Sequence, residues 1–415
     1  MDFSIFGNRI SKSSGIMELM DDLGNALNGK DKKYMLGGGN PSHIEEVNKI
    51  WRKRISQIMS NENDFEKMFV NYDAPQGNIS FLESLANLLN KKFNWNITAE
   101  NIGISNGSQN GYFILLNIFS GLYKNNQKRK ILLPIVPEYI GYSDQLVSEN
   151  SFQGTIPKIV EVKDNFFKYN IDFDSLNISN DISAICVSRP TNPTGNVISD
   201  EELTILSDIA TKNNIPLFID NAYGLPFPSI IFDKATPIWN ENIVYSMSLS
   251  KLGIPSVRTG IFVARKEIIK ALSRANAIMN LSNSTIGQFI TKPLIENGDI
   301  IRISEEIIKP YYYNKSRKTI KIIQDTFGDS IDYKIHVSQG ALFLWIWFKN
   351  LPITTSELYE KLKEKNVLVV PGKYFFFGLD KKWNHSEECI RITYSQSEED
   401  IKTAFQIIHD VIRAI

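Results

Sequence analysis

Cysteine and histidine are scarce in this sequence, which contains two cysteines and four histidines among 415 residues. Two cysteines cannot form a disulfide framework, and the histidines are scattered without the spacing of zinc ligands. An excess of charge is also missing, because 46 basic side chains are balanced by 46 acidic ones. A neutral chain does not favour nucleic acid or an anionic membrane as its main partner. We therefore expect no metal, nucleic-acid or membrane site.

Long hydrophobic runs are absent as well. The most apolar stretch, residues 112–119, is far too short to span a bilayer and is interrupted by Asn117. The first residues, Met1 to Ser4, lack the basic and then apolar segments of a signal peptide. Together with the low cysteine content, this predicts a cytoplasmic location as the default.

The chain has the composition of an ordinary globular protein, with 42% hydrophobic and 22% charged residues. From about residue 100 to 265, short apolar runs alternate with helical patterns, which predicts an α/β domain with a mostly parallel sheet covered by helices. Ser199 and Glu202 form a capping-box pair that marks the start of one of these helices. The expected strands are residues 101–105, 131–136, 184–188, 216–220, 243–247 and 260–264.

The pattern changes after Pro293. A long helical stretch over residues 298–327, with a kink or break at Pro310, leads into a second α/β unit. Its expected strands are residues 340–348, 367–370 and 389–394, and its expected helices are residues 354–365 and 398–415. We predict a large domain over residues 51–297 and a smaller one over residues 298–415, with residues 1–50 packing against the smaller domain.

The segment Ser248-Leu249-Ser250-Lys251, followed by Arg258, is the first candidate for chemistry. A lysine just past a buried strand is costly to desolvate, and a Schiff base would explain it, because a shielded lysine with a lowered pKa is a good nucleophile. Arg258 and the hydroxyl groups would then hold a phosphate. The alternative is a solvated lysine at the end of a strand.

The second candidate is Asp220, followed by Asn221, Ala222 and Tyr223, directly after an apolar run. The carboxyl end of a parallel strand is where α/β folds place ligand sites. Near a pyridine nitrogen, the Asp220 carboxylate would keep that nitrogen protonated, so that the ring becomes an electron sink. Tyr223 would donate to a phenolate oxygen of the ring. A solvent-facing turn is the alternative.

Three further segments follow expected strands. The turn at residues 189–195 (R-P-T-N-P-T-G) contains Asn192, and its composition alone explains a turn. Residues 106–109 (N-G-S-Q) open a helix, where free N–H groups bind phosphate unless the segment is a plain N-cap. Tyr139, in P-E-Y, offers an aromatic face to a flat ring, or is an ordinary core or surface tyrosine.

Arg391 lies within the β-branched strand at residues 389–394. An arginine is awkward as core filler, but it is suited to a bidentate clamp on a substrate carboxylate. The alternative is a buried ion pair with a carboxylate of the protein.

The ordered set of these motifs resembles the fold-type-I, class I/II aminotransferases, which depend on pyridoxal 5'-phosphate (PLP). The set also contains G-N-P at residues 39–41 and the pair Tyr72 and Gly77, and the likeness runs from end to end. Longer strings, such as residues 137–142 (P-E-Y-I-G-Y) and 188–198 (S-R-P-T-N-P-T-G-N-V-I), resemble the subgroup that exchanges the amino group between L-valine and pyruvate.

Carried over residue by residue, the resemblance implies a complete set of roles. Lys251 would bind PLP covalently and then act as general base and acid, and Asp220 would pair with the pyridine nitrogen. The other expected cofactor contacts are Asn192 and Tyr223 at the ring oxygen, Tyr139 on the ring face, and Gly107, Ser108, Gln109, Ser248, Ser250 and Arg258 at the phosphate, with Tyr72 from the second subunit of a homodimer. The expected substrate contacts are Arg391, Asn192 and the Gly39 backbone for the carboxylate, and Ile16 for the side chain.

The resemblance thus predicts transamination between L-valine and pyruvate, which yields 3-methyl-2-oxobutanoate and L-alanine. Two alternatives remain. One is another PLP enzyme of the same fold, such as an aminotransferase of different specificity or a β-lyase. The other is a PLP-sensing regulator without activity, although the chain enters its aminotransferase-like segments almost at once and has no net charge.

Overall fold

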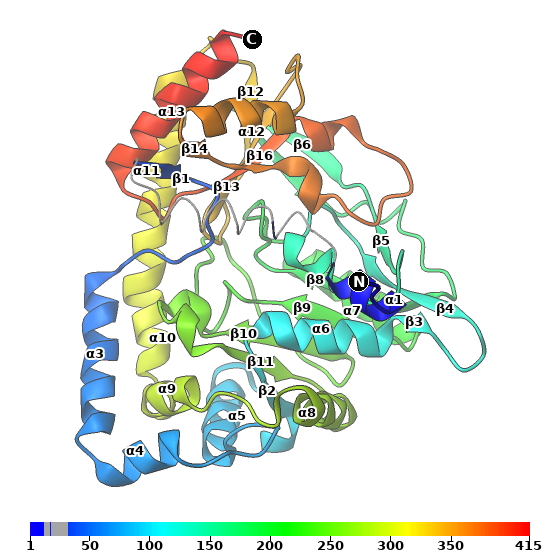
Figure 1. Ribbon diagram of the computed structural model, residues 1–415, viewed down its shortest axis with the longest axis vertical. Coiled ribbons are helices and arrows are strands. Elements are labelled where there is room, and N and C mark those ends of the chain that lie inside the picture. Colours follow the sequence, from blue (N-terminus) through cyan, green and yellow to red (C-terminus); the bar gives the residue numbers. More distant parts are fainter. Residues whose placement is uncertain (12–16, 18–31) are drawn as a thin grey trace.

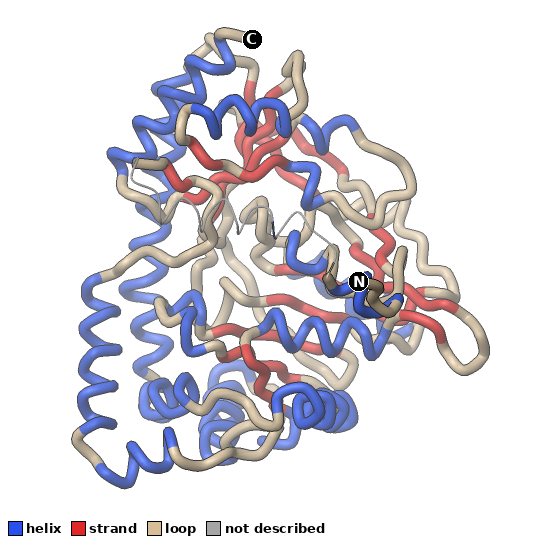
Figure 2. The backbone as a smooth tube through the Cα atoms, in the orientation of Figure 1, coloured by secondary structure: helices blue, strands red, loops and turns tan. Residues whose placement is uncertain are grey.

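The computed structural model describes residues 1–11, 17 and 32–415, and its main feature is two β-sheets, each with its own helices (Figure 1). The larger sheet lies in the lower half of the view and the smaller one in the upper half (Figure 2). No helix among the described residues is both long and apolar enough to cross a membrane. The cytoplasmic location remains a prediction.

The larger sheet has eight strands in the order β2–β11–β10–β9–β8–β4–β3, with β5 beside β4. Strands β5, β4, β8, β9 and β10 run parallel, whereas β11 is antiparallel to both β10 and β2. Each strand predicted between residues 101 and 264 overlaps an observed strand. The bounds are β2 Ile102–Asn106, β3 Gly121–Leu122, β4 Lys128–Leu133, β5 Phe152–Gly154, β8 Ile182–Ser188, β9 Leu217–Asp220, β10 Ile243–Ser248 and β11 Thr259–Val263.

Helices cover both faces of this sheet, which explains why its central strands are apolar almost throughout. Phe218 of β9 packs in one hydrophobic cluster with residues of α6 and α8, whereas its neighbours Leu217 and Ile219 pack in another with residues of α5 and α7. The capping box of Ser199 and Glu202 opens α7, as predicted. The helices of this part are α1 Ile5–Ile10, α3 Glu45–Met59, α4 Glu62–Phe69, α5 Ile79–Phe93, α6 Ser108–Phe119, α7 Asp200–Lys212, α8 Lys266–Asn280 and α9 Ile286–Glu296.

The smaller sheet has six strands in the order β15–β16–β13–β12–β7–β6. Its strands are β6 Lys158–Val162, β7 Phe166–Asn170, β12 Tyr333–His336, β13 Phe343–Phe348, β15 Val370–Pro371 and β16 Cys389–Thr393, and its helices include α12 Thr355–Glu364 and α13 Glu398–Arg413. The β6–β7 hairpin comes from the middle of the chain, and β7 pairs in parallel with β12. The predicted division by residue number did not include this hairpin in the C-terminal unit.

Two connections join the halves of the chain. β1 (Tyr34–Met35) pairs in parallel with β14 (Val367–Leu368), so this N-terminal strand lies against the C-terminal part. The second connection is helical. Here α10 (Asp299–Ile303) leads through a π-helical turn at Ser304–Ile308 into α11 (Lys309–Phe327). The break predicted at Pro310 corresponds to this turn, because proline lacks the N–H that a regular helix needs at that position.

Candidate active site

The site forms where three neighbouring parallel strands end (Figure 1). Ser188 at the end of β8 pairs with Asp220 at the end of β9, and Asp220 pairs with Ser246 near the end of β10. The turn with Asn192 follows β8, and Lys251 follows β10. Motifs that are far apart in the sequence therefore meet at one edge of the sheet, where α/β folds bind ligands.

Lys251 is partly buried, and among the described residues its amino group contacts a carbonyl oxygen and an aromatic ring but no carboxylate. Its Nζ donates to the Gly39 carbonyl oxygen at 2.7 Å and lies 5.3 Å from the centre of the Tyr223 ring. Burial, together with the positive charges of Arg391 and Arg258, lowers the pKa of Lys251 to about 8. Such a lysine has a substantial neutral fraction near neutral pH, which is what a nucleophilic amine requires. The solvated lysine considered from the sequence does not match this environment.

Gly107 and Arg258 form a cradle at the start of α6. Gly107 is the N-cap of the helix at φ 82°, and no described side chain caps the helix there. A Cβ atom at residue 107 would lie 2.1 Å from Nη2 of Arg258, so the guanidinium group occupies the space that only glycine leaves open. A positive charge beside free N–H groups at a helix N-terminus is a favourable site for a phosphate.

The other expected phosphate contacts lie around this cradle. The Ser108 hydroxyl donates to the Met247 carbonyl at 3.3 Å, and Gln109 Nε2 donates to the Gly141 carbonyl at 3.1 Å. Ser248 is buried, and its hydroxyl oxygen accepts from the Ser250 N–H at 3.1 Å. Asn106 does not cap α6 either, because its side chain accepts from the Ser284 N–H at 2.9 Å.

Asp220 is buried, and neutral donors surround its carboxylate. The Tyr142 hydroxyl donates to Oδ2, while the Ser246 hydroxyl at 3.2 Å and the Ala222 N–H at 3.1 Å donate to Oδ1. Burial raises the pKa of Asp220, and these three hydrogen bonds oppose that shift. The sequence motif identified Asp220 but not Tyr142, although Tyr142 lies only three residues beyond Tyr139.

Two tyrosines complete the ring-binding set expected from the sequence. Tyr139 packs on Gly141, where a Cβ atom would come within 2.3 Å of its ring, and it meets the edge of Tyr142 at a centroid distance of 5.2 Å. Tyr223 is buried, and its ring contacts both Lys251 and Phe343, with a centroid distance of 6.0 Å to the latter. Tyr223 therefore lies beside Lys251, whereas Tyr139 lies beside Tyr142, the donor to Asp220.

Glu138 is a buried carboxylate that the sequence analysis did not single out. It accepts from the N–H and the hydroxyl of Ser188, both at 2.7 Å, and from the Tyr139 N–H at 2.9 Å. Burial raises its pKa to about 7. Glu138 thus ties the Tyr139 loop to the end of β8, where the Asn192 turn begins. Its position after an apolar strand, like that of Asp220, was the only signal in the sequence.

Arg391 is buried on β16, and its charge has no carboxylate partner among the described residues. Nη1 donates to Asn192 Oδ1 at 2.9 Å and Nη2 to the Gly37 carbonyl at 2.6 Å, whereas Nε has no partner there. The buried ion pair considered from the sequence is therefore not formed with any described residue. The Gly37 carbonyl contacts Arg391, while that of Gly39 contacts Lys251.

Two aromatic rings hold the guanidinium group of Arg391. Its Cζ lies 4.2 Å from the centre of the Phe343 ring and 5.3 Å from that of Phe375. Rings stabilise a cation without neutralising it, so the charge remains available to an anionic ligand. Sequence reasoning missed both phenylalanines, since neither lies in a recognisable motif.

One expected contact, Tyr72, is not part of this cluster. The Tyr72 side chain is 82% exposed, so it is free to contact a second chain. Ile16, the expected side-chain contact, lies outside the described residues.

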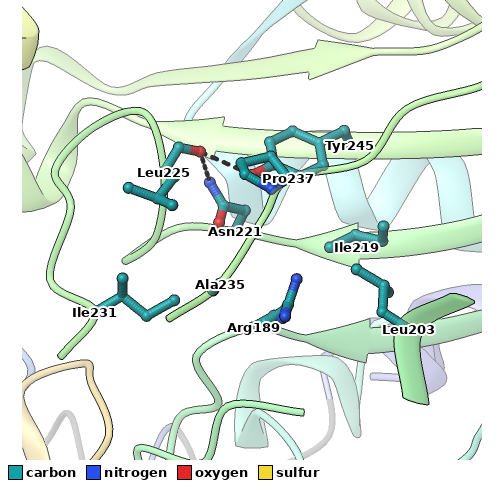
Figure 3. A pocket seen from close by; sticks show the side chains of 9 residues that line it. All are labelled: Arg189, Leu203, Ile219, Asn221, Leu225, Ile231, Ala235, Pro237 and Tyr245. Carbon is teal, nitrogen blue, oxygen red and sulfur yellow. Dashed lines mark hydrogen bonds between the residues drawn. The ribbon is translucent and has the colours of Figure 1, made fainter. Parts of the chain in front are cut away.

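Arg189 is buried next to the site, and each nitrogen of its guanidinium group has a hydrogen-bond partner. Its guanidinium group donates to the carbonyls of Ile198 and Thr236 and forms an ion pair with Asp200. It lines a small pocket with Asn221, among other residues (Figure 3). Because Asp200 already neutralises Arg189, this arginine is not available to a second carboxylate.

Comparison with known proteins agrees with this geometry. Residues 33–408 match the family described as "Aminotransferase class I and II". The chain is 44% identical to valine–pyruvate aminotransferase of Escherichia coli strain K12, over 99% of this chain and 98% of that protein. The fold is also that of solved aminotransferase structures. A putative amino-acid aminotransferase from Psychrobacter arcticum 273-4 superposes with a TM-score of 0.96, at 42% identity over 100% of this chain and 99% of the other. Valine–pyruvate aminotransferase AvtA from Salmonella typhimurium LT2 superposes with a TM-score of 0.88, at 43% identity over 96% of this chain and 98% of the other.

Proposed function

The chain belongs to the class I and II aminotransferases, and from that premise we propose that it uses PLP to transfer an amino group between L-valine and pyruvate. The products would be 3-methyl-2-oxobutanoate and L-alanine. The observation that carries this choice of substrates is the full-length similarity to the valine–pyruvate aminotransferase of E. coli. A different specificity on the same fold, or a β-lyase, is the alternative that the experiment below tests.

The residues present fit PLP. The start of α6 with the Arg258 guanidinium packed on Gly107 suits its phosphate, and Lys251 supplies an amine with a lowered pKa. Asp220 supplies the carboxylate for the ring nitrogen, and Tyr139 an aromatic face. When bound, PLP provides an electron sink that stabilises negative charge at the substrate Cα.

The protein groups around the ring would perform proton transfer and orientation. The Lys251 amine lies beside Tyr223 and Gly39, and as a neutral base it would take the Cα proton and later return it. Arg391 and Asn192 would hold the α-carboxylate, which fixes the bond at Cα that faces Lys251. No described carboxylate balances the charge of Arg391, so a substrate carboxylate would be its ion-pair partner.

The charge balance also supports small aliphatic substrates. Arg391 and Arg258 are the two cations that lower the pKa of Lys251, and they are assigned here to the α-carboxylate and the phosphate. An acidic side chain would need a further cation, because burying an unpaired carboxylate is costly. Arg189 cannot serve, since Asp200 already neutralises it.

We expect valine and alanine, with 2-aminobutyrate, to be better donors than aspartate, glutamate or aromatic amino acids. Discrimination between valine and its shorter relatives should be modest, about 1–3 kcal/mol per methylene. The measurement is a panel of amino donors and keto acids, with each product identified by mass spectrometry. Aspartate or glutamate as good as valine, with 2-oxoglutarate preferred over pyruvate, would exclude the valine–pyruvate assignment. Net β-elimination would favour the lyase.

We also propose a homodimer whose two active sites are shared. Tyr72 is 82% exposed, and the nearby Phe69, Val70 and Ile79 are also exposed, at 52%, 68% and 61%. Exposed apolar side chains that gather on one segment are typical of a protein interface. Tyr72 would then reach the cofactor phosphate of the other subunit.

Mixed dimers test this arrangement. Tyr72→Ala should lower activity, and Lys251→Ala should abolish it. A mixed dimer of the two variants has one intact site, which combines Lys251 of one chain with Tyr72 of the other. Refolded mixtures should therefore regain activity. Each mixed dimer should reach at most half the wild-type activity, because its second site lacks both residues. A mixture no more active than Tyr72→Ala would show that Tyr72 acts within its own chain. A fully active monomer in analytical ultracentrifugation would contradict the dimer itself.

A further inference from the structure

A chain of buried hydroxyl groups reaches the carboxylate of Asp220 from inside the protein. The Tyr142 hydroxyl donates to Oδ2, and the Ser246 hydroxyl donates to Oδ1 at 3.2 Å. The Tyr112 hydroxyl lies 2.9 Å from the Ser246 hydroxyl and extends the chain by one group. Each oxygen of Asp220 therefore has a donor on a protein side chain.

A buried tyrosine must bond its hydroxyl group to something, and a backbone carbonyl would be sufficient. Tyr245, which is equally buried on β10, does this by donating to the Leu225 carbonyl at 2.7 Å. Tyr142 is fully buried but donates to the carboxylate that the proposed function pairs with the cofactor. Core packing alone does not require that choice.

The donors to Asp220 are all neutral. None of the ion pairs between described residues includes Asp220, so no cation balances its charge there. Burial raises the pKa of Asp220. In place of a cation, the hydrogen bonds from Tyr142, Ala222 and Ser246 lower that pKa. Loss of any one of them makes the carboxylate more basic.

We propose that Tyr142 and Ser246 are positioning residues that hold Asp220 as an ionised, oriented acceptor for the ring nitrogen of the cofactor. The proposal rests on the proposed function, because it concerns the partner of a PLP ring. A less basic Asp220 leaves the shared proton on the ring nitrogen, and a more basic one takes it. Tyr142 thus controls where that proton resides by acting through Asp220.

Tyr142→Phe tests this role, because it removes only the hydroxyl group. PLP labelled with ¹⁵N in the ring is bound to each variant, and the ¹⁵N chemical shift reports whether the ring nitrogen carries a proton. In Tyr142→Phe the signal should move from the protonated towards the unprotonated range. The kcat value should fall about ten- to a hundredfold, the worth of one hydrogen bond to a charged group, while KM changes little. Tyr245→Phe is the matched control and should keep both the wild-type signal and the wild-type kcat.

Ser246→Ala provides the same test at the other oxygen and should shift the signal in the same direction. It keeps the proposal testable if Tyr142→Phe fails to fold, as judged by near-ultraviolet circular dichroism. An unchanged ¹⁵N signal in folded variants would overturn the proposal, and so would an equal shift in Tyr245→Phe, which would indicate general repacking. If the wild type binds no PLP, the proposed function itself is wrong. This result can be told apart from an unchanged ¹⁵N signal and from a shift in Tyr245→Phe, because both of those require bound PLP.

Discussion

Lys251→Ala is expected to abolish transamination and covalent capture of PLP. Loss of the proton-transferring group alone typically costs about 10²–10⁴-fold in rate, and here the same residue is also the nucleophile. Borohydride treatment of the wild type with PLP should fix the cofactor on Lys251, as located by peptide mass spectrometry. Lys168→Ala is a suitable control, because Lys168 is also a partly buried lysine with a lowered pKa but bonds to Val197 and Gln339 instead.

The same assignment has a consequence for pH. A pKa of about 8 leaves roughly a tenth of Lys251 neutral at pH 7, far more than for an ordinary lysine. Only the neutral amine attacks a carbonyl, so capture of PLP by the apoprotein should accelerate as pH rises towards 8 and level off above it. Reducible attachment of PLP in the Lys251→Ala protein, at a rate equal to the wild type, would contradict the assignment.

Arg391→Ala is expected to weaken the binding of amino and keto acids while PLP remains bound. Truncating one partner of a buried, hydrogen-bonded charge pair costs about 2–5 kcal/mol, which corresponds to a large rise in KM. Arg391→Lys should recover only part of this loss, since an ammonium group cannot form the same fork or stack between Phe343 and Phe375.

The matched control for Arg391 is Arg189→Ala. Arg189 is equally buried, but it has a carboxylate partner, Asp200, within the protein. Its loss should lower the melting temperature without a selective effect on substrate affinity. The measurements are the Kd of PLP from absorbance and the KM of pyruvate for each variant. An equal loss of PLP and pyruvate affinity in Arg391→Ala would mean that Arg391 is structural.

The sequence alone predicted six of the eight strands of the larger sheet, all except the short β3 and β5, and the residues that follow the strands at the site. Lys251, Asp220 and Asn192 each follow an apolar run, and parallel strands deliver their carboxyl ends to one edge, so local pattern was enough to bring them together. The capping box of α7 and the break near Pro310 are also local features, because each depends on the hydrogen bonds of a few neighbouring residues.

Tertiary structure alone decided what surrounds these groups. Tyr142 and Asp220 are 78 residues apart, and β7 joins a sheet whose other strands, apart from β6, come more than 160 residues later. The stacking of Phe343 and Phe375 on Arg391 likewise depends on how β13 and the segment after β15 pack together. No local pattern encodes such contacts, because a buried hydroxyl or ring takes its partner from whichever element packs against it.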